Sequence, residues 1–328
     1  MIQRLRIYES TCIDPYTNLA TEKHLMDTTA PGECTLYLWQ NQNTVVIGRN
    51  QNPWSECRTA LLEAEGGKLA RRLSGGGAVF HDLGNLNFTF LVNRSDYNVD
   101  RQLSVICAAC TMAGISAEKS GRNDLLAGDR KFSGNAFYHN ATHAYHHGTL
   151  LINADMDKLQ RYLSPSKAKL AAKGVASVRS RVVNLNTLSP NLTCQTMRAY
   201  MAAAFENVYS LPAETVVLTQ EDHSAIEALR SEYCSWEYLY GTPMPFTFEC
   251  QSRFLWGSIH LQLQAKNGII TGAKAYSDAM DWQLPSAVEH ALIGCRFCLT
   301  DMTQCLRAAL PNPQSAEDLC ALLAEQEL

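Results

Sequence analysis

Three consecutive glycines follow two arginines in the stretch 71–90, and this stretch constrains the fold more than any other part of the chain. Its residues are RRLSGGGAVFHDLGNLNFTF. Because glycine has no Cβ, the backbone at Gly75–Gly77 can take positive φ values and approach a ligand closely. The alternation of apolar residues from Leu86 to Phe90 predicts a strand with one strongly buried face. The stretch therefore predicts a turn that leads directly into a core strand.

The same stretch predicts an anion site. Successive N–H groups in a glycine-rich loop can form a concave nest for an anion, and Arg72 adds planar donors suited to phosphate or carboxylate. The stretch has neither the Gly-Lys-Ser/Thr ending of a P-loop nor the Gly-x-Gly-x-x-Gly pattern of a dinucleotide-binding turn. We expect an anionic, phosphorylated ligand held in another way. The alternative is an ordinary glycine-rich turn flanked by solvated arginines.

Composition limits the class of protein. The chain has 328 residues, 46% hydrophobic and 18% charged, which indicates an ordinary globular protein with one large domain or a large and a small one. A net charge of −4 gives no general attraction to nucleic acid, so we expect no such partner. No apolar stretch reaches membrane-spanning length and no signal-peptide run follows the N-terminus, so we expect a cytoplasmic protein without a membrane partner.

Two cysteine pairs have the spacing of a redox or zinc half-site. Cys107 and Cys110 are three residues apart, as are Cys295 and Cys298. No matching His or Cys pair has a suitable spacing, and Cys107 lies on the apolar face of a helix predicted over 101–114. We interpret both pairs as core thiols, because free cysteine packs as a small hydrophobe. Reduced thiols fit a cytoplasmic location.

The N-terminal half contains further start and turn signals. Asp14-Pro15 predicts a helix start, with Asp as N-cap and Pro in the first turn. On that helix we interpret Glu22 as a solvated glutamate, although it could face a pocket. The β-rich runs 36–39 and 44–48 are separated by polar residues, and this pattern predicts a hairpin.

The prolines in 241–245 indicate a domain boundary. Beyond it, Asn267-Gly268 predicts a hairpin, and three helices are expected over 285–294, 300–310 and 315–326. The expected fold class is α+β. We expect a mixed β-sheet flanked by helices in a catalytic domain over 1–246, with its core over about 30–212, and a small α+β accessory domain over 247–328.

A second informative stretch surrounds Lys131. Lys131 lies between an Asp-Arg turn and a Ser-Gly step, where a lysine at a strand end can place a charge on a phosphate or carboxylate oxygen. The alternative is an exposed lysine, the commonest situation. His146 and His147 begin another strand. Because adjacent strand residues point to opposite faces, we do not expect them to bind one metal together.

The chain resembles the lipoate–protein ligase A family of the biotin/lipoate ligase superfamily. The resemblance rests on 71–85, 129–134 and 147–151, with supporting matches at 44–54, 121–125 and 177–182. It implies a class II synthetase-like catalytic core. It also implies that (R)-lipoate attacks the α-phosphate of ATP, with Mg²⁺ present, to form lipoyl-AMP and pyrophosphate. A lysine ε-amine of an acceptor then takes the lipoyl group and AMP is released.

The acceptors implied by the resemblance are the lipoyl domains of 2-oxoacid dehydrogenase complexes and the glycine-cleavage H protein. The enzyme is expected to be a monomer. Lys131 is implied as the catalytic residue, in contact with both carbonyl and phosphate, and Asp124 as a residue near Mg²⁺. Arg179 and Arg181 are implied to lie on a loop that covers the adenylate.

The remaining implied contacts fall into two groups. ATP and the adenylate would be bound by Arg72, Gly77, Ala78, Val79, Phe80, Asn123 and Lys131. Lipoate would be bound by Arg72, Ser74, Gly75, Gly76, His81, Lys131 and His147. Phe132, which departs from the residues found after this lysine in other members, is expected to alter the pocket wall.

Two alternatives remain open from the sequence. The first is a lipoyl or octanoyl transferase that takes the acyl group from a carrier protein, some of which use a cysteine nucleophile; no cysteine lies in 71–90 or 128–136. The second is an inactive lipoyl-binding homologue, which predicts a lost lysine or a filled glycine loop. A biotin ligase fits the motifs less well. Neither the preferred acceptor nor the choice between lipoate and octanoate follows from the sequence.

Overall fold

Two compact units make up the chain in the computed structural model, which describes residues 1–120, 124–163, 182–241 and 244–326. The first unit comprises 1–46, 57–71 and 79–239. The second comprises 47–56, 72–78 and the chain from 240 onward. The glycine loop thus belongs to the same unit as the C-terminal region. The division of catalytic and accessory roles between 1–246 and 247–328 stays a prediction.

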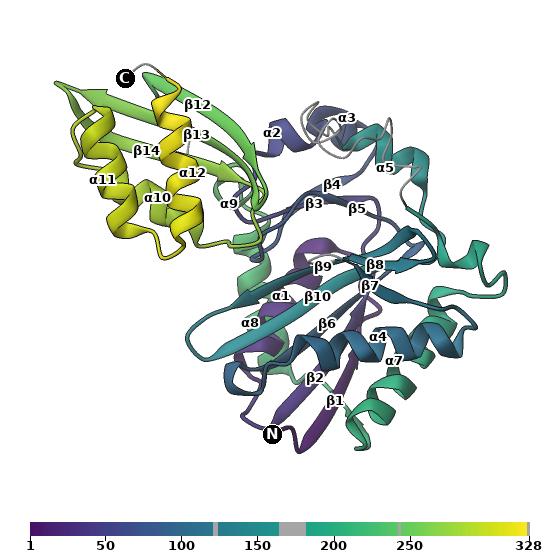
Figure 1. The fold of residues 1–328 in the computed structure, drawn as a ribbon. Coiled ribbons are helices and arrows are strands. Elements are labelled where there is room, and N and C mark those ends of the chain that lie inside the picture. The colour runs from purple at the N-terminus through teal and green to yellow at the C-terminus, as the bar shows by residue number, and fades with distance from the viewer. Residues whose placement is uncertain (121–123, 164–181, 242–243, 327–328) are drawn as a thin grey trace. The chain divides into compact units, whose positions relative to one another are not determined.

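A mixed, eight-stranded sheet forms the centre of the first unit (Figure 1). In spatial order its strands are β11 (Ala213–Thr215), β1 (Arg4–Glu9), β2 (Glu33–Trp39), β6 (Asn85–Asn93), β10 (His143–Leu151), β9 (Arg130–His139), β8 (Asp124–Ala127) and β7 (Glu118–Ser120). β1 pairs in parallel with β11 and β2, and the other pairs are antiparallel. The predicted mixed sheet flanked by helices is confirmed.

The two faces of this sheet differ in chemistry. Phe88 and Phe90 point to one face, where they join the apolar core with residues of α4 (Val99–Met112) and α7 (Cys194–Tyr209). Figure 1 shows these two helices beside the sheet. Thr89 points to the other face and contacts a residue of α1 (Pro15–Asp27), which packs against α8 (Gln220–Tyr233). The predicted helix at 101–114 is confirmed, and all the cysteines are free thiols.

The predicted hairpin between 36–39 and 44–48 is wrong. β3 (Thr44–Ile47) lies between β4 (Lys68–Arg71) and β5 (Val79–His81) in a separate three-stranded sheet. β2 is buried along its whole length and is paired on both edges, with β1 and β6, so it has no edge left for β3. The remaining short elements before the boundary are α2 (Pro53–Glu56), α3 (Thr59–Ala64), η1 (Arg94–Asp96), α5 (Met156–Tyr162), η3 (Leu185–Thr187) and α9 (Trp236–Tyr240).

The C-terminal region has its own apolar core, built from one antiparallel sheet and three helices (Figure 1). Its elements are β12 (Phe248–Phe254), β13 (Gly257–Lys266), β14 (Ile269–Ser277), α10 (Leu284–Leu292), α11 (Leu299–Ala309) and α12 (Pro313–Ala324). Asn267 and Gly268 have φ values of 54° and 74°, as a tight hairpin turn requires, so that prediction is confirmed. Across the described ranges, no helix has the length and apolarity needed to cross a membrane.

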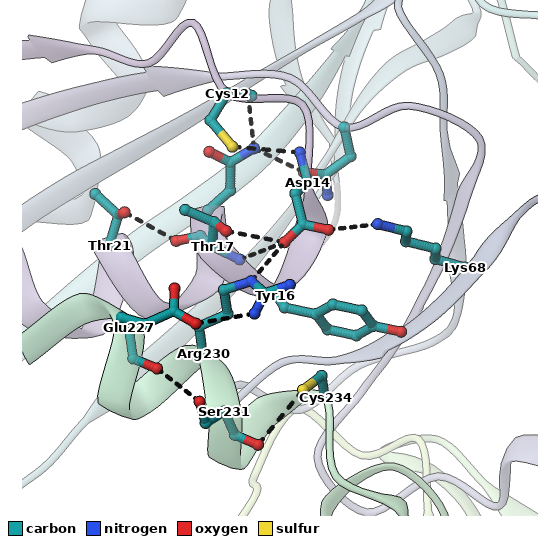
Figure 2. Close-up of polar contacts among 12 residues, drawn as sticks. Cys12, Asp14, Tyr16, Thr17, Thr21, Lys68, Glu227, Arg230, Ser231 and Cys234 are labelled. Atoms are coloured by element: carbon teal, nitrogen blue, oxygen red, sulfur yellow. Dashed lines mark hydrogen bonds and ion pairs between the residues drawn. The ribbon is translucent and has the colours of Figure 1, made fainter. Parts of the chain in front are cut away.

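A single carboxylate ties the start of α1 to two other elements, as Figure 2 shows. Asp14 caps the helix by accepting a hydrogen bond of 3.0 Å from the backbone N–H of Thr17. Its other oxygen, Oδ1, lies 2.5 Å from Nζ of Lys68 on β4. The capping oxygen, Oδ2, also lies 3.5 Å from Nε of Arg230 on α8. Burial raises the pKa of Asp14, but hydrogen bonds from Lys68 and Thr17 lower it, and the net pKa lies below its ordinary value. The carboxylate therefore stabilises this corner in its charged form.

We expect Asp14→Asn to lower the free energy of unfolding by about 1 kcal/mol at pH 7, because Asn keeps the cap but loses two partly exposed ion pairs. A carboxyl whose folded pKa is depressed contributes stability above its unfolded pKa of about 4, and that contribution disappears as pH falls through the folded pKa. Urea denaturation should therefore show a gap between wild type and variant at pH 7 that closes near pH 2. A gap of equal size at both pH values would contradict this role.

Candidate active site

A β-bulge determines where Lys131 points. On β8 and β9, Ser133 pairs with Leu125 and Lys131 pairs with Leu126, so Phe132 is the extra residue. Phe132 is fully buried in the apolar core. A bulge changes the direction of the side chains on either side of it. Lys131 therefore extends over Gly134, where its Nζ lies 3.0 Å from the position that a Cβ on Gly134 would take. The expectation that Phe132 alters the pocket wall is therefore wrong, since the bulge turns Phe132 into the core on the face opposite Lys131.

Lys131 forms an ion pair with Asp124. Nζ lies 2.6 Å from Oδ1 of Asp124, and both side chains are about one-third exposed, at 34% and 32%. The two predicted site residues are thus brought together, within reach of solvent and of a ligand. In the described part of the chain, no group of three or more His, Cys, Asp or Glu residues could by itself hold a metal ion.

A row of paired residues crosses the sheet from this ion pair. We call it the polar row; its members, in strand order, are Trp39, Asn87, Thr149, Gly134 and Asp124. Residues that pair directly across neighbouring strands point to the same face of a sheet. The row therefore lies on the face away from Phe88 and the apolar core, and Lys131 covers it at Gly134.

Beside the polar row lies a buried hydrogen-bonded network. Glu22 on α1 accepts a 2.7 Å hydrogen bond from the Thr89 hydroxyl, and its Oε1 lies 2.8 Å from Nδ1 of His147. The indole N–H of Trp39 donates to Thr89 at 3.1 Å. The Glu22 side chain is only 3% exposed, so its interpretation as a solvated glutamate is wrong. The reason is that α1 packs on the polar face, where strand residues provide partners for a carboxylate.

His146 lies on the other face, as the alternation predicts. Its ring packs against Phe88, Phe90 and Phe137, and its Nε2 lies 2.8 Å from Oδ1 of Asn135. Burial lowers the pKa of His146 to about 3, so the ring is neutral at physiological pH. His146 is therefore a core histidine, and His147 is the histidine of the site face.

Residues 79–81 form β5 in the first unit. Phe80 is buried, and Nδ1 of His81 lies 3.2 Å from the amide nitrogen of Asn41. The His81 ring meets the Trp39 ring edge-on at a centroid separation of 6.1 Å. His81 is therefore next to one end of the polar row.

The Arg72 side chain stabilises the glycine loop by hydrogen bonds to the loop itself. Its Nη2 donates to the carbonyl oxygens of Gly75 and Gly77 at 2.8 and 2.7 Å, and its Nε donates to the Ser74 hydroxyl at 3.0 Å. The side chain is almost fully buried. Gly76 has a φ of +89°, which a residue with a side chain rarely adopts. The arginine that the sequence offers as an anion ligand thus has a structural role in shaping the loop.

The loop also packs on the segment that follows β14, within the second unit. The N–H of Gly76 donates to the carbonyl of Ala279 at 3.1 Å. A Cβ on Gly75 would lie 2.3 Å from the same carbonyl oxygen. Nearby, the N–H of Arg49 donates to the Ser74 carbonyl at 2.9 Å, and its guanidinium lies 4.6 Å from the Trp282 ring centroid. Close packing against the protein backbone therefore requires glycine at position 75, independently of any ligand.

The structure sorts the predicted site residues into two groups. Those of the first unit are Val79, Phe80, His81, Asp124, Lys131 and His147; those of the second are Arg72, Ser74, Gly75, Gly76, Gly77 and Ala78. Asn123, Arg179 and Arg181 lie outside the described residues. The sequence analysis did not identify Trp39 and Asn87 as members of the polar face, and it named a pocket-facing Glu22 only as the less favoured interpretation. The signal available for Asn87 was a pair of polar residues, Asn87 and Thr89, at alternate positions of a core strand.

Comparisons with known proteins agree with this fold. Residues 14–206 match the family described as lipoyl protein ligase A/B catalytic domain, and 243–323 match the bacterial lipoate protein ligase C-terminus. A lipoate-protein ligase A of Bdellovibrio bacteriovorus is 42% identical over 300 residues, which cover 89% of this chain and 88% of that protein.

Solved structures give the same result. P. falciparum LipL1 in complex with lipoate has a TM-score of 0.84 and 26% identity, over 97% of this chain and 98% of that one. A lipoate-protein ligase A bound with ATP shares the fold, with a TM-score of 0.64 and 23% identity over 74% of this chain and 99% of that one.

The mixed sheet flanked by helices and the C-terminal α+β region are the architecture of lipoate ligases of known structure. The chain belongs to the lipoyl protein ligase A/B family. It is a ligase.

We expect Gly75→Ala to lower the free energy of unfolding by about 1–3 kcal/mol, because the added methyl group meets a backbone carbonyl that cannot move aside cheaply. Gly77→Ala is the matched control, since a Cβ at Gly77 meets nothing within 4 Å. Calorimetry of the two variants should show a loss for the first and little change for the second. Equal melting temperatures would mean that the loop does not pack on Ala279 in solution.

Proposed function

We propose that this chain is an ATP-dependent lipoate–protein ligase that acts through lipoyl-AMP. The observation that carries the proposal is the bulge of β9, which presents Lys131 on the polar face beside Asp124. Family membership supports the same activity, because the proteins it resembles over most of its length are named lipoate-protein ligase A.

The first step joins two anions. A lipoate carboxylate oxygen attacks the α-phosphorus of ATP, a bond forms between that oxygen and phosphorus, and the bond to the leaving pyrophosphate breaks. Carboxylate and triphosphate repel each other, so the reaction needs fixed positive charge where they meet. Lys131 supplies a compact charge with rotatable donors, which can contact the carboxyl oxygen and the phosphate together.

The second step transfers the acyl group. The neutral ε-amine of the acceptor lysine attacks the acyl carbonyl, the bond from carbonyl carbon to the AMP oxygen breaks, and the amine loses a proton. Lys131 stabilises the negative charge that develops on the carbonyl oxygen. Lys131, which brings the carboxylate and the α-phosphate together in the first step, therefore also serves the second.

The other predicted contacts are proposed on the family resemblance. Gly77, Ala78, Val79, Phe80 and Asn123 are assigned to ATP and the adenylate. Ser74, Gly75, Gly76, His81 and His147 are assigned to lipoate, and Arg179 and Arg181 to a segment that covers the adenylate. For Arg72, the hydrogen bonds to the loop carbonyls support a role in holding the loop in its binding shape.

The residues at Lys131 fit a Mg²⁺ ion that arrives with ATP. Mg²⁺ takes one or two carboxylates, keeps several waters and uses substrate phosphates for the rest of its ligands. Asp124 is a partly exposed carboxylate in this position and would hold the ion. When bound, Mg²⁺ neutralises phosphate charge.

A cysteine-dependent transfer from a carrier protein is less well supported. Burial raises the pKa of the Cys34 and Cys110 thiols to about 12, which disfavours the nucleophilic thiolate. Both residues belong to the apolar core, on the face away from Lys131. The acceptors we propose are lipoyl domains of 2-oxoacid dehydrogenase complexes and the glycine-cleavage H protein. The monomeric state and the cytoplasmic location stay predictions.

Lys131→Ala should reduce lipoate-dependent exchange of pyrophosphate into ATP by about 100-fold or more, because it removes the charge at the reacting oxygens. Lys131→Arg should recover part of the activity at most, since a planar guanidinium does not reproduce a point charge. Lys119→Ala, at an exposed ion pair with Asp100, is the matched control and should behave as wild type. Absence of exchange in folded wild-type protein would contradict the ligase, and thioester donors would then be tested.

Asp124→Asn should raise the Mg²⁺ concentration needed for half-maximal exchange by about tenfold, because it removes the carboxylate that would hold the ion. Asp129→Asn, in the exposed turn before β9, is the control for loss of one negative charge. The measurement is a Mg²⁺ titration at saturating ATP and lipoate. A lower rate with an unchanged Mg²⁺ requirement would show that Asp124 only orients Lys131.

A further inference from the structure

Asn87 is a buried amide with no partner. Its side chain is fully buried, and neither its amide oxygen nor its amide nitrogen has a hydrogen-bond partner among the described residues. It lies in the polar row, between Trp39 on β2 and Thr149 on β10. Burial of an unsatisfied amide destabilises a protein, and native structures contain few of them. The fold therefore does not account for Asn87.

The neighbouring polar groups are already bonded to one another. The Trp39 indole donates to Thr89, Thr89 donates to Glu22, and Glu22 contacts His147. This network does not include Asn87; Thr89 and His147 lie one row further along the strands, and Trp39 of the polar row bonds to Thr89. The donor and acceptor of the Asn87 amide are therefore both unused in the described part of the chain.

The position of Asn87 relative to Lys131 suits a carboxyl group. Asn87 on β6 pairs with Thr149 on β10, and Thr149 pairs with Gly134 on β9, whose outer surface Lys131 covers. Strands lie about 4.8 Å apart, so the Cα atoms of Asn87 and Gly134 are separated by about 10 Å along the row, and Nζ of Lys131 lies over Gly134. Both side chains project onto the same face. The remaining gap suits a carboxyl group that accepts hydrogen bonds of about 2.9 Å from either side.

We propose that Asn87 is a substrate-binding residue whose amide donates a hydrogen bond to the carboxyl oxygen of the acyl substrate, opposite Lys131. The inference rests on the proposed function and adds a residue to it. In the first step the amide orients the attacking carboxylate. In the second it donates to the carbonyl oxygen as negative charge develops there, and because a neutral amide does not titrate, its contribution is independent of pH.

The test uses Asn87→Leu, which has nearly the same shape but no amide, and Asn87→Asp, which keeps the shape and adds a negative charge. Binding and pyrophosphate exchange are measured with lipoate and with octanoate, which shares the carboxyl group but lacks the dithiolane ring. We expect Asn87→Leu to lose about 10- to 100-fold with both acids, as for one hydrogen bond to a charged group. Asn87→Asp should lose more, through repulsion of the carboxylate.

The melting temperature separates binding from structure. Because Asn87→Leu removes an unsatisfied buried amide, its melting temperature should equal or exceed that of wild type. Gln102→Leu is the matched control: Gln102 on α4 is also fully buried with both amide atoms unpartnered in the described chain. Its substitution should leave exchange unchanged.

Each contrary result has a distinct meaning. A loss confined to lipoate would place Asn87 at the dithiolane and overturn the inference. A parallel fall in melting temperature and activity would show a structural role and also overturn it. Absence of exchange in wild type would instead overturn the proposed function. In that case, weaker binding of both acids by Asn87→Leu than by wild type would still support the role of Asn87.

Discussion

Alternation of side chains along β6 and β10 divides the central sheet into an apolar face and a polar face, and the candidate site depends on this division. Phe88 and His146 lie on the core side, whereas Asn87, Thr89 and His147 lie on the other. A slip of one residue in register would exchange the two faces. The bulge at Phe132 interrupts the alternation at one place, so an apolar side chain enters the core while Lys131 lies on the polar face.

The polar face contains two kinds of buried polar group. Glu22, Thr89, His147 and Trp39 are joined to one another by hydrogen bonds, which hold their side chains in place. Asn87 lies beside these side chains and is unsatisfied within the described chain. In the site that we propose, hydrogen-bonded side chains surround one amide whose partner would be the ligand, and this directs binding energy to one part of the substrate.

The glycine loop packs closely on its own protein, which is a second use for a motif that is typical of ligand binding. Three glycines suggest close approach of a ligand, and the structure shows close approach of the Ala279 carbonyl and internal bonds from Arg72. These observations explain why neither a side chain at Gly75 nor a lysine in place of Arg72 would preserve the loop. Local sequence cannot distinguish these uses, because both require the same lack of a Cβ and the same planar donors.

The sequence by itself determined the family, the mixed-sheet class and the helices of the C-terminal region, because glycine runs, caps, alternation and motif spacing are local signals. The role of Lys131 as the reactive cation stays a prediction. Only the tertiary structure decided that β3 belongs to a different sheet from β2 and that Glu22 is buried and in contact with His147. It also decided that the Asn87 amide has no hydrogen-bond partner among the described residues. These features depend on which strands become neighbours. That choice is made by burial and pairing between residues far apart in the chain, and no local window of sequence contains it.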